Sequence, residues 1–160
     1  TGIECEIAFR IGRDLINPPY SREQIADAID SLVPLVEICD NRLVDNKAAP
    51  AEWRLADNGG NGAILVGNAV EEWRFINTQQ QAVTLRFDGK IVAEKPGNPN
   101  PDLVAVVMLL VNQAGSHCGG IRAGQVVTTG TMTGNIAATP GTEIVAMFRE
   151  LGEMRITLEK

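Results

Sequence analysis

Three acidic residues near the start of the chain have the types and spacing of a cation site. Glu4 and Glu6 lie in a segment that alternates polar and apolar residues. In an extended strand, side chains two positions apart point to the same face. Glu37 interrupts a second apolar run, where burying an unpartnered charge is unfavourable. Three carboxylates brought together repel one another, and a divalent cation relieves that repulsion. Ligation by oxygen alone favours Mg²⁺, Mn²⁺ or Ca²⁺ over zinc.

The acidic pair also has an ordinary interpretation, because alternating acidic residues are common on the solvated face of a sheet. Glu37 favours the metal site, since the run from Leu35 to Cys39 otherwise has the character of a core strand. Asp40 and Arg42 follow it closely, and they would orient Glu37 or close an ion pair behind the metal. The alternative for these two residues is a surface salt bridge worth about 0–1 kcal/mol.

Two strands must position the acidic residues. Alternation predicts a strand over residues 3–11, with one face in the core. The side chains expected in that core are Ile3, Cys5, Ile7 and Phe9. Ser21 and Gln24 have the form of a capping box, and apolar residues at helical spacing predict a helix from there to Pro34. Residues 35–40 are then expected to form the strand that carries the third carboxylate.

The remaining segments predict mostly strands. Asp88-Gly89 indicates a hairpin between residues 81–87 and 91–94. Asn100 is the expected cap of a helix that runs to about residue 114 and is closed by Gly115. A short helix is expected at 50–56, a buried strand at 63–66, and further strands at 125–129, 144–148 and 154–158. Runs of strands with helices at irregular places predict an α+β domain and not a doubly wound sheet.

Other polar segments carry weaker signals. Asn58 opens a glycine-rich stretch that would present donors to an anion, although a plain turn is the favoured interpretation. Residues 59–62 match neither a P-loop nor a dinucleotide fingerprint. Thr131 lies in a threonine- and glycine-rich segment after a strand. Its hydroxyls and glycines suit carboxylate binding, and the alternative interpretation is a loop that ends the strand. His117, the single histidine, is interpreted as a solvated loop residue. Cys5 and Cys39 are interpreted as small buried hydrophobic residues.

The bulk composition fits one ordinary globular domain. The chain has 160 residues, of which 44% are hydrophobic and 21% charged. Its net charge of −6, without a cluster of Lys or Arg, makes nucleic acid and anionic membranes poor partners. The longest apolar run, Leu103–Val111, is too short to cross a bilayer. Three cysteines without framework spacing favour reduced thiols and a cytoplasmic location.

Four stretches of the chain together resemble a known family. They are residues 4–12, residues 36–42, residues 56–67, and residues 123–134 with Pro140-Gly141 and Leu151-Gly152. In this order and spacing they are similar to the fumarylacetoacetate hydrolase superfamily. The closer resemblance is to its branch of 2-keto-4-pentenoate hydratases and oxalocrotonate-type decarboxylases. The resemblance covers nearly the whole chain.

This resemblance implies a fold and a set of site residues. The fold would be a mixed β-roll of the family's C-terminal-domain type with a few flanking helices. Glu4, Glu6 and Glu37 would hold Mg²⁺ or Mn²⁺, to which a small 2-oxo acid binds through its carboxylate and 2-oxo oxygen. Thr131 would contact the substrate carboxylate, and Asn58 would lie in the pocket loop. The family also implies a homo-oligomer and association between hydratase and decarboxylase subunits.

The implied activity is that of a metal-dependent lyase, a hydratase of 2-hydroxy-2,4-dienoate or 2-oxo-4-enoate acids in aromatic meta-cleavage catabolism. Decarboxylation of a 2-oxo dioate is the first alternative. Carbon–carbon hydrolysis of an acylpyruvate is disfavoured, because no histidine precedes His117. The family has an N-terminal segment that supplies acid–base groups. We therefore expect residues 1–160 to be a single metal-binding domain with those groups upstream of Thr1, or else an incomplete binding or partner subunit.

Overall fold

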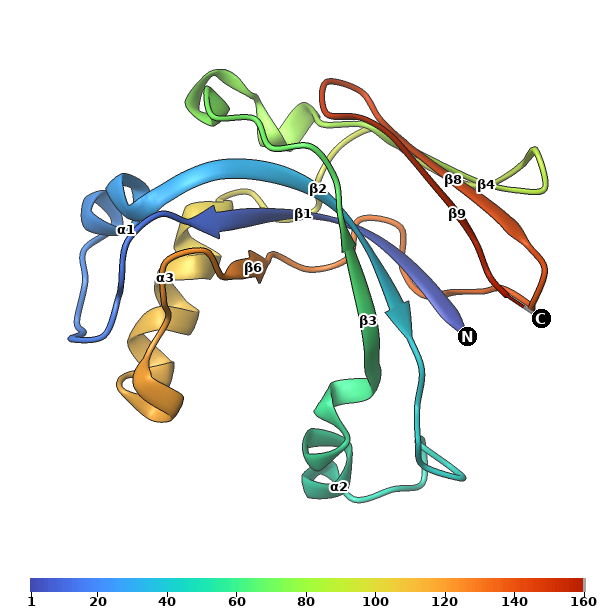
Figure 1. Cartoon of the computed structure of the whole chain (residues 1–160), viewed down its shortest axis with the longest axis horizontal. Coiled ribbons are helices and arrows are strands. Elements are labelled where there is room, and N and C mark those ends of the chain that lie inside the picture. The colour runs from blue at the N-terminus through green and yellow to red at the C-terminus, as the bar shows by residue number, and fades with distance from the viewer. Residues whose placement is uncertain (160) are drawn as a thin grey trace.

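Two antiparallel sheets dominate the computed structural model, which describes residues 1–159 (Figure 1). The first sheet has the order β3-β2-β1-β6, with β7 also paired to β1. Its strands are β1 (Gly2–Ile11), β2 (Ile29–Cys39), β3 (Asn61–Val66), β6 (Val126–Thr128) and β7 (Ile136–Ala137). The second sheet has the order β5-β4-β8-β9. Its strands are β4 (Val83–Phe87), β5 (Lys90–Lys95), β8 (Glu143–Phe148) and β9 (Gly152–Thr157).

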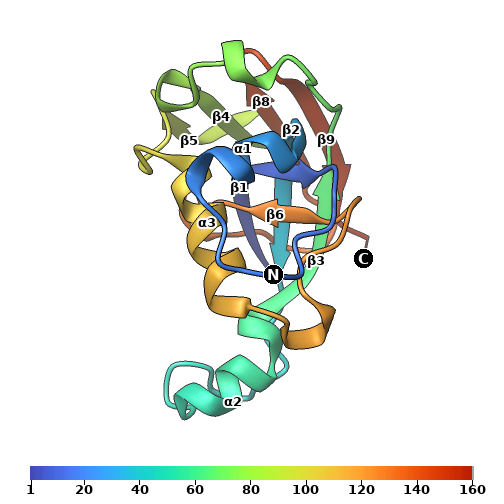
Figure 2. The ribbon, with the colours of Figure 1, turned by 90° about the vertical axis from the view of Figure 1, so that its left-hand side faces the viewer.

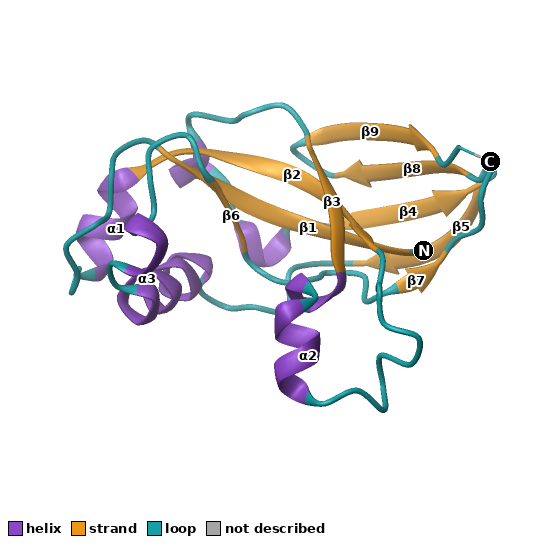
Figure 3. Ribbon diagram, turned by 60° about the horizontal axis from the view of Figure 1, so that its bottom comes forward, coloured by secondary structure: helices purple, strands orange, loops and turns teal. Residues whose placement is uncertain are grey.

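Three short α-helices flank the sheets. They are α1 (Arg22–Ala28), α2 (Ala51–Ala56) and α3 (Leu103–Ala114). Single 3₁₀ turns occupy Asn58–Gly60, Trp73–Phe75, Thr78–Gln80 and His117–Gly119. Helices α1 and α3 lie together at one end of the first sheet, whereas α2 projects from the end of β3 (Figures 2 and 3). No residue of α2 is buried. Within residues 1–159, no helix combines the length and the apolar character needed to cross a membrane.

The main core lies between the two sheets. The four β1 side chains expected there are at most 1% exposed, which confirms the alternation: Ile3, Cys5, Ile7 and Phe9. The second sheet contributes Leu85, Ile144 and Phe148 to the same cluster. Phe9 also packs edge-on against Trp73, with ring centroids 5.1 Å apart. The opposite face of β1 is therefore turned away from this core, and it is the face that carries Glu4 and Glu6.

The helix expected from Ser21 to Pro34 is wrong beyond Ala28. Its capping box is present, but Ile29 to Pro34 belong to β2. Tertiary pairing decides this segment, because β2 pairs with β1 along nearly its whole length. Pro34 is tolerated because the pairing of β2 with β3 begins only at Leu35.

The other expected elements are present, with small corrections. The hairpin at Asp88-Gly89 is confirmed, and both residues have positive φ. Helix α3 is capped by Asp102 rather than Asn100, since the Asp102 carboxylate accepts from the Ala105 N–H. The segment predicted as a buried strand is the half-exposed edge strand β3, with Ile64 43% exposed.

Candidate metal centre

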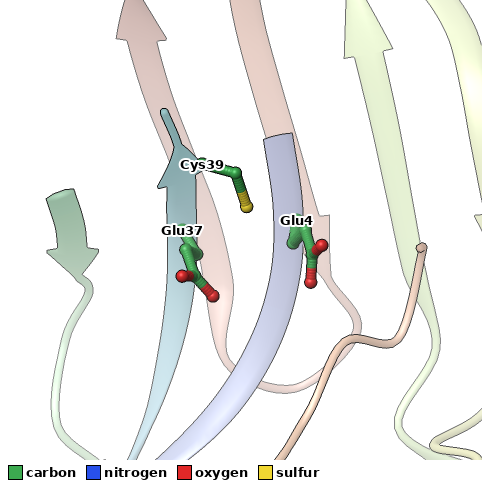
Figure 4. A group of neighbouring side chains, drawn as sticks. All are labelled: Glu4, Glu37 and Cys39. Carbon is green, nitrogen blue, oxygen red and sulfur yellow. The ribbon is translucent and has the colours of Figure 1, made fainter. Parts of the chain in front are cut away.

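The register between β1 and β2 places two carboxylates directly opposite each other. Glu4 pairs with Glu37, and Cys39 follows Glu37 on the same face of β2. The carboxylate oxygens of Glu4 and Glu37 and the Sγ of Cys39 all lie within 4.8 Å of one another (Figure 4). Like charges directly opposite across a sheet are destabilising. This arrangement is therefore unfavourable unless a cation or hydrogen-bond donors compensate it.

Glu6 lies on the same face, one step further along β1. It pairs with Leu35 and is only 3% exposed. The Gly130 N–H donates to its Oε2 at 3.0 Å. Burial raises the pKa of the Glu6 carboxyl, and the nearby charges of Glu37 and Glu4 raise it further. Its carboxylate is not part of the 4.8 Å group, so the three predicted ligands share a face without forming one tight cluster.

Two asparagines that the sequence reasoning missed hold the opposed carboxylates. Asn61 Nδ2 donates to Glu37 Oε1 at 2.7 Å, and Asn135 Nδ2 donates to Glu4 Oε1 at 3.0 Å. Both come from segments rich in glycine, and Asn135 is 131 positions away from its partner, so no local pattern indicates the contact. Among residues 1–159, no ion pair involves any of the three carboxylates.

A glycine makes room for this arrangement. Gly2 is the β1 residue opposite Cys39. A Cβ added to Gly2 would lie 2.1 Å from the Oδ1 of Asn135, the amide that binds Glu4. The interpretation of Cys39 as a buried hydrophobic residue is therefore wrong, because it is half-buried and borders the acidic pair. Burial raises the pKa of its thiol to about 12, and the charges of Glu4 and Glu37 act in the same direction.

Asp40 and Arg42 do not form the expected contacts with Glu37. Arg42 pairs with Asp57, with 2.6 Å between Nε and Oδ1. It also donates to the backbone carbonyls of Asp40 at 3.0 Å and Asn61 at 2.9 Å. The Asp40 side chain is exposed and forms no hydrogen bond with the described residues. Arg42 thus holds the loop before β3, and it affects Glu37 only through the position of Asn61.

The two predicted substrate contacts lie in loops at the edges of this face. Thr131 is half-buried between Gly130, which binds Glu6, and Asn135, which binds Glu4. Its hydroxyl accepts from the Gly134 N–H at 3.0 Å. Asn58 is exposed in the turn that leads into β3, with φ of 58°. Thr131 thus lies in the loop whose other residues contact Glu4 and Glu6. Asn58 has no hydrogen bond to any of the three carboxylates.

An apolar cavity opens beside the carboxylates. Its volume is about 430 Å³, and its walls include Ile64, Leu110, Ile121 and Val126. Ile64 is the β3 partner of Glu37, so its side chain shares a face with that carboxylate. The face therefore offers clustered negative charge next to an apolar space. Carboxylate oxygens with no cationic partner are suitable donors for a hard divalent ion, so the residues present fit such a metal.

Comparison with known proteins identifies a family that matches this chain. The family model for the C-terminal region of fumarylacetoacetate (FAA) hydrolase matches residues 1–159. A 4-oxalocrotonate decarboxylase of Pseudomonas putida is 27% identical over an alignment of 157 positions, which covers 95% of this chain and 58% of that protein. A 2-keto-4-pentenoate hydratase of Paraburkholderia xenovorans is 27% identical over an alignment of 161 positions, which covers 98% of this chain and 58% of the relative. The chain thus spans less than two thirds of the length of these relatives.

Solved structures show the same fold. The 4-oxalocrotonate decarboxylase of Pseudomonas putida G7, complexed with magnesium and adipate, superposes with a TM-score of 0.85 at 23% identity. The alignment covers 98% of this chain and 60% of that one. A maleylpyruvate hydrolase from Sphingobium sp. SYK-6, in complex with manganese and pyruvate, gives a TM-score of 0.66 at 19% identity, with 99% of this chain and 54% of that one covered. The expected family fold, a β-roll with a few flanking helices, is confirmed.

Proposed function

Because the chain belongs to the fumarylacetoacetate hydrolase C-terminal family, we propose that it is the metal-binding part of a lyase. The reaction is hydration of a 2-hydroxy-2,4-dienoate or 2-oxo-4-enoate acid in aromatic meta-cleavage catabolism. The observation that carries the proposal is the Glu4–Glu37 pair, opposed across two strands without a cationic partner in residues 1–159. The curated relatives that are named hydratases support it.

In this proposal Glu4 and Glu37 hold Mg²⁺ or Mn²⁺, and Glu6 completes the acidic face. Structures of similar fold contain magnesium, calcium and manganese, which supports a hard divalent ion. The bound ion supplies a Lewis acid that polarises the 2-oxo group of the substrate. Asn61 and Asn135 orient the two carboxylates by donating one hydrogen bond to each.

We assign the remaining residues of this face to binding of the organic acid substrate. The Thr131 hydroxyl and the Asn58 amide provide polar contacts for its carboxylate, and the cavity beside Ile64 receives its hydrocarbon part. We assign no general acid or base within the chain. The relatives that match this chain extend beyond the matched region. Asp40 and Arg42 support the site through the loop that positions Asn61.

Decarboxylation of a 2-oxo dioate is the second candidate. It is supported by a 4-oxalocrotonate decarboxylase among the curated relatives, at the same 27% identity as the hydratase. Both reactions pass through an enolate, so one metal site serves either. Hydrolysis of an acylpyruvate has less support, because the single histidine, His117, is exposed in the loop after α3. A homo-oligomer in the cytoplasm, with a decarboxylase or hydratase partner, completes the proposal.

The test is metal binding followed by turnover. Calorimetric titration of the purified chain with Mn²⁺ should show one site, and Glu37→Gln should abolish it. Glu52→Gln, on the exposed helix α2, is the matched control and should bind as the unchanged chain does. Unchanged affinity in Glu37→Gln would exclude the site.

Turnover, measured on the protein as its gene encodes it, separates the candidate functions. Loss of dienoate absorbance with metal present indicates a hydratase, and release of CO₂ from a 2-oxo dioate indicates a decarboxylase. Cleavage of an acylpyruvate to two acids indicates the hydrolase. Tight metal binding without any of these three reactions would support the binding or partner subunit instead.

A further inference from the structure

We propose that Asn100 is a positioning residue of the acidic face, because it fixes the peptide group between Thr129 and Gly130 with its N–H directed at Glu6. This role rests on the proposed function, since it concerns the same face, and it adds a residue from the loop between β5 and α3. Asn100 Nδ2 donates to the Thr129 carbonyl oxygen at 2.5 Å. The Gly130 N–H donates to Glu6 Oε2 at 3.0 Å. One peptide group is therefore held from both sides.

The two hydrogen bonds act on a single rigid unit. The atoms of a peptide group lie in one plane, and in the trans form the carbonyl oxygen and the amide hydrogen point in opposite directions. The peptide group between Thr129 and Gly130 is trans. A donor that holds its carbonyl oxygen on one side therefore turns its N–H to the other side, where Glu6 lies. Polarisation also couples the two bonds, because a carbonyl that accepts a hydrogen bond makes the N–H of the same group a stronger donor.

Backbone preference does not fix this orientation. Gly130 has φ of 99°, and glycine adopts positive and negative φ about equally readily. Rotation of the peptide group by half a turn would direct the Thr129 carbonyl oxygen at the Glu6 carboxylate. The hydrogen bond from Asn100 opposes that rotation, because the rotation would remove its acceptor. A Cβ on Gly130 would lie 3.3 Å from Asn100 Nδ2, so the glycine also leaves room for the amide.

Other contacts anchor the loop without fixing this peptide group. Strands β6 and β7 both pair with β1, and the loop that joins them contacts the acidic residues. The Thr129 hydroxyl donates to the Ile7 carbonyl at 2.7 Å, and the Cys5 N–H donates to the Thr133 hydroxyl at 3.0 Å. Both bonds use threonine side chains, so they hold the loop on β1 but do not involve the peptide group before Gly130. Asn100 supplies that constraint.

Asn100 is itself held in place on both sides. Its backbone N–H donates to Asn98 Oδ1 at 2.8 Å, and Asn98 is only 9% exposed. The Asn98 N–H donates to the Gln79 carbonyl at 3.2 Å, and the Gln79 side chain donates to the Pro101 carbonyl at 2.7 Å. These bonds tie the loop before α3 to the turn before β4. The amide that reaches Thr129 therefore comes from a fixed position outside the first sheet.

The experiment is NMR spectroscopy of the protein as its gene encodes it, without metal, with ¹³C at threonine carbonyls and ¹⁵N in glycine. This labelling selects glycines that follow threonine, among them Gly130 and Gly134. An N–H that donates to a carboxylate has a proton resonance shifted downfield. The Gly130 signal is identified as the one that moves upfield in Glu6→Gln.

Asn100→Ala should move the Gly130 signal upfield as well, because the peptide group is no longer held toward Glu6. The Gly134 signal should change little, since its N–H donates to a hydroxyl in the same loop. Asn68→Ala, at an exposed position, is the matched control and should move neither signal. If Asn100→Ala does not fold, Asn100→Asp replaces it in this measurement, because it has the same shape and no donor.

Metal affinity is the second readout. Mn²⁺ affinity should fall about three- to tenfold in Asn100→Ala, which is the effect of one ordinary hydrogen bond, and should be unchanged in Asn68→Ala. A Gly130 signal that does not move in Asn100→Ala would overturn the role of Asn100 and leave the metal site intact. A moved signal with unchanged Mn²⁺ affinity would overturn that role too. Absence of Mn²⁺ binding in the unchanged protein would overturn the metal site, while the Gly130 signal would still decide the orientation of the peptide group.

Discussion

At the scale of single residues, the candidate site depends on compensation of like charge. Glu4 and Glu37 face each other across the two strands, and each receives one amide hydrogen bond. These amides fix the orientation of the carboxylates, while a bound cation would relieve their repulsion. Gly2 belongs to the same arrangement, because a larger residue would displace the Asn135 side chain. The site therefore extends beyond the acidic residues to the amides that position them.

Asn61→Ala should weaken Mn²⁺ binding on the order of ten- to a hundredfold, because partners of metal ligands have effects of that size. The physical reason is that Glu37 loses its 2.7 Å hydrogen bond and is no longer held toward Glu4. Calorimetric titration measures the change. Asn68→Ala is the control, since Asn68 is exposed beyond the end of β3 and should leave the affinity unchanged. Equal affinities in the two variants would contradict the role of Asn61.

At the scale of elements, the α1–α3 contact has an electrostatic component. Arg22 on α1 binds Asp102, the cap of α3, with 2.9 Å between Nε and Oδ2. The hydrogen bond from Arg22 holds the pKa of the Asp102 carboxyl below its usual range, and the Ala105 N–H acts in the same direction. Asp102 is charged in the unfolded chain above about pH 4. Its contribution is therefore fully present above that pH and is lost as pH falls through the lower folded pKa.

Asp102→Ala should lower the free energy of unfolding by about 1–2 kcal/mol at pH 7, because it removes both the cap and the ion pair. Asp102→Asn keeps a cap acceptor and removes only the charge, so it should cost about 0–1 kcal/mol. The cost of D102N should shrink toward pH 2. Urea unfolding at the two pH values measures this. A cost of D102N that grows as the pH falls would contradict the sign derived above.

At the scale of the whole molecule, stability comes from the interface between the two sheets. The large buried side chains of β1 and β8 meet there, with Phe9 and Phe148 at most 1% exposed. The other face of the first sheet has a separate, smaller apolar group around Ala8, Val33 and Leu35. The sheet thus divides the molecule into a core side and a site side. Changes on one side can be tested with little effect on the other.

Phe148→Ala should lower the free energy of unfolding by about 3–5 kcal/mol, since it leaves a cavity between the sheets. Its neighbour Met147 points away from the core and is 42% exposed. Met147→Ala is the matched control and should change stability by less than about 1 kcal/mol. Urea unfolding of both variants without metal measures the difference. Similar losses in the two variants would mean that β8 does not pack as described.

Much of this architecture could be predicted from local sequence. Alternation in β1 determined that Glu4 and Glu6 share a face opposite the core, and Asp88-Gly89 determined a hairpin. These features involve residues close together in the chain. The periodicity of apolar residues and the preferences of turn residues are therefore sufficient to predict them. The family resemblance extended this to the overall fold, because four short stretches in the right order are sufficient to identify it.

Only the tertiary structure decided which residues meet. Residues 29–34 have apolar spacing compatible with a helix, and pairing with β1 makes them a strand. The same register places Glu37 opposite Glu4 and not Glu6, and brings Cys39 to the site. Asn135 reaches Glu4 from a distant loop, and Arg42 binds Asp57 and not the acidic residues of the candidate site. Strand register and loop contacts are long-range properties, and they depend on the packing of the whole chain rather than on any local pattern.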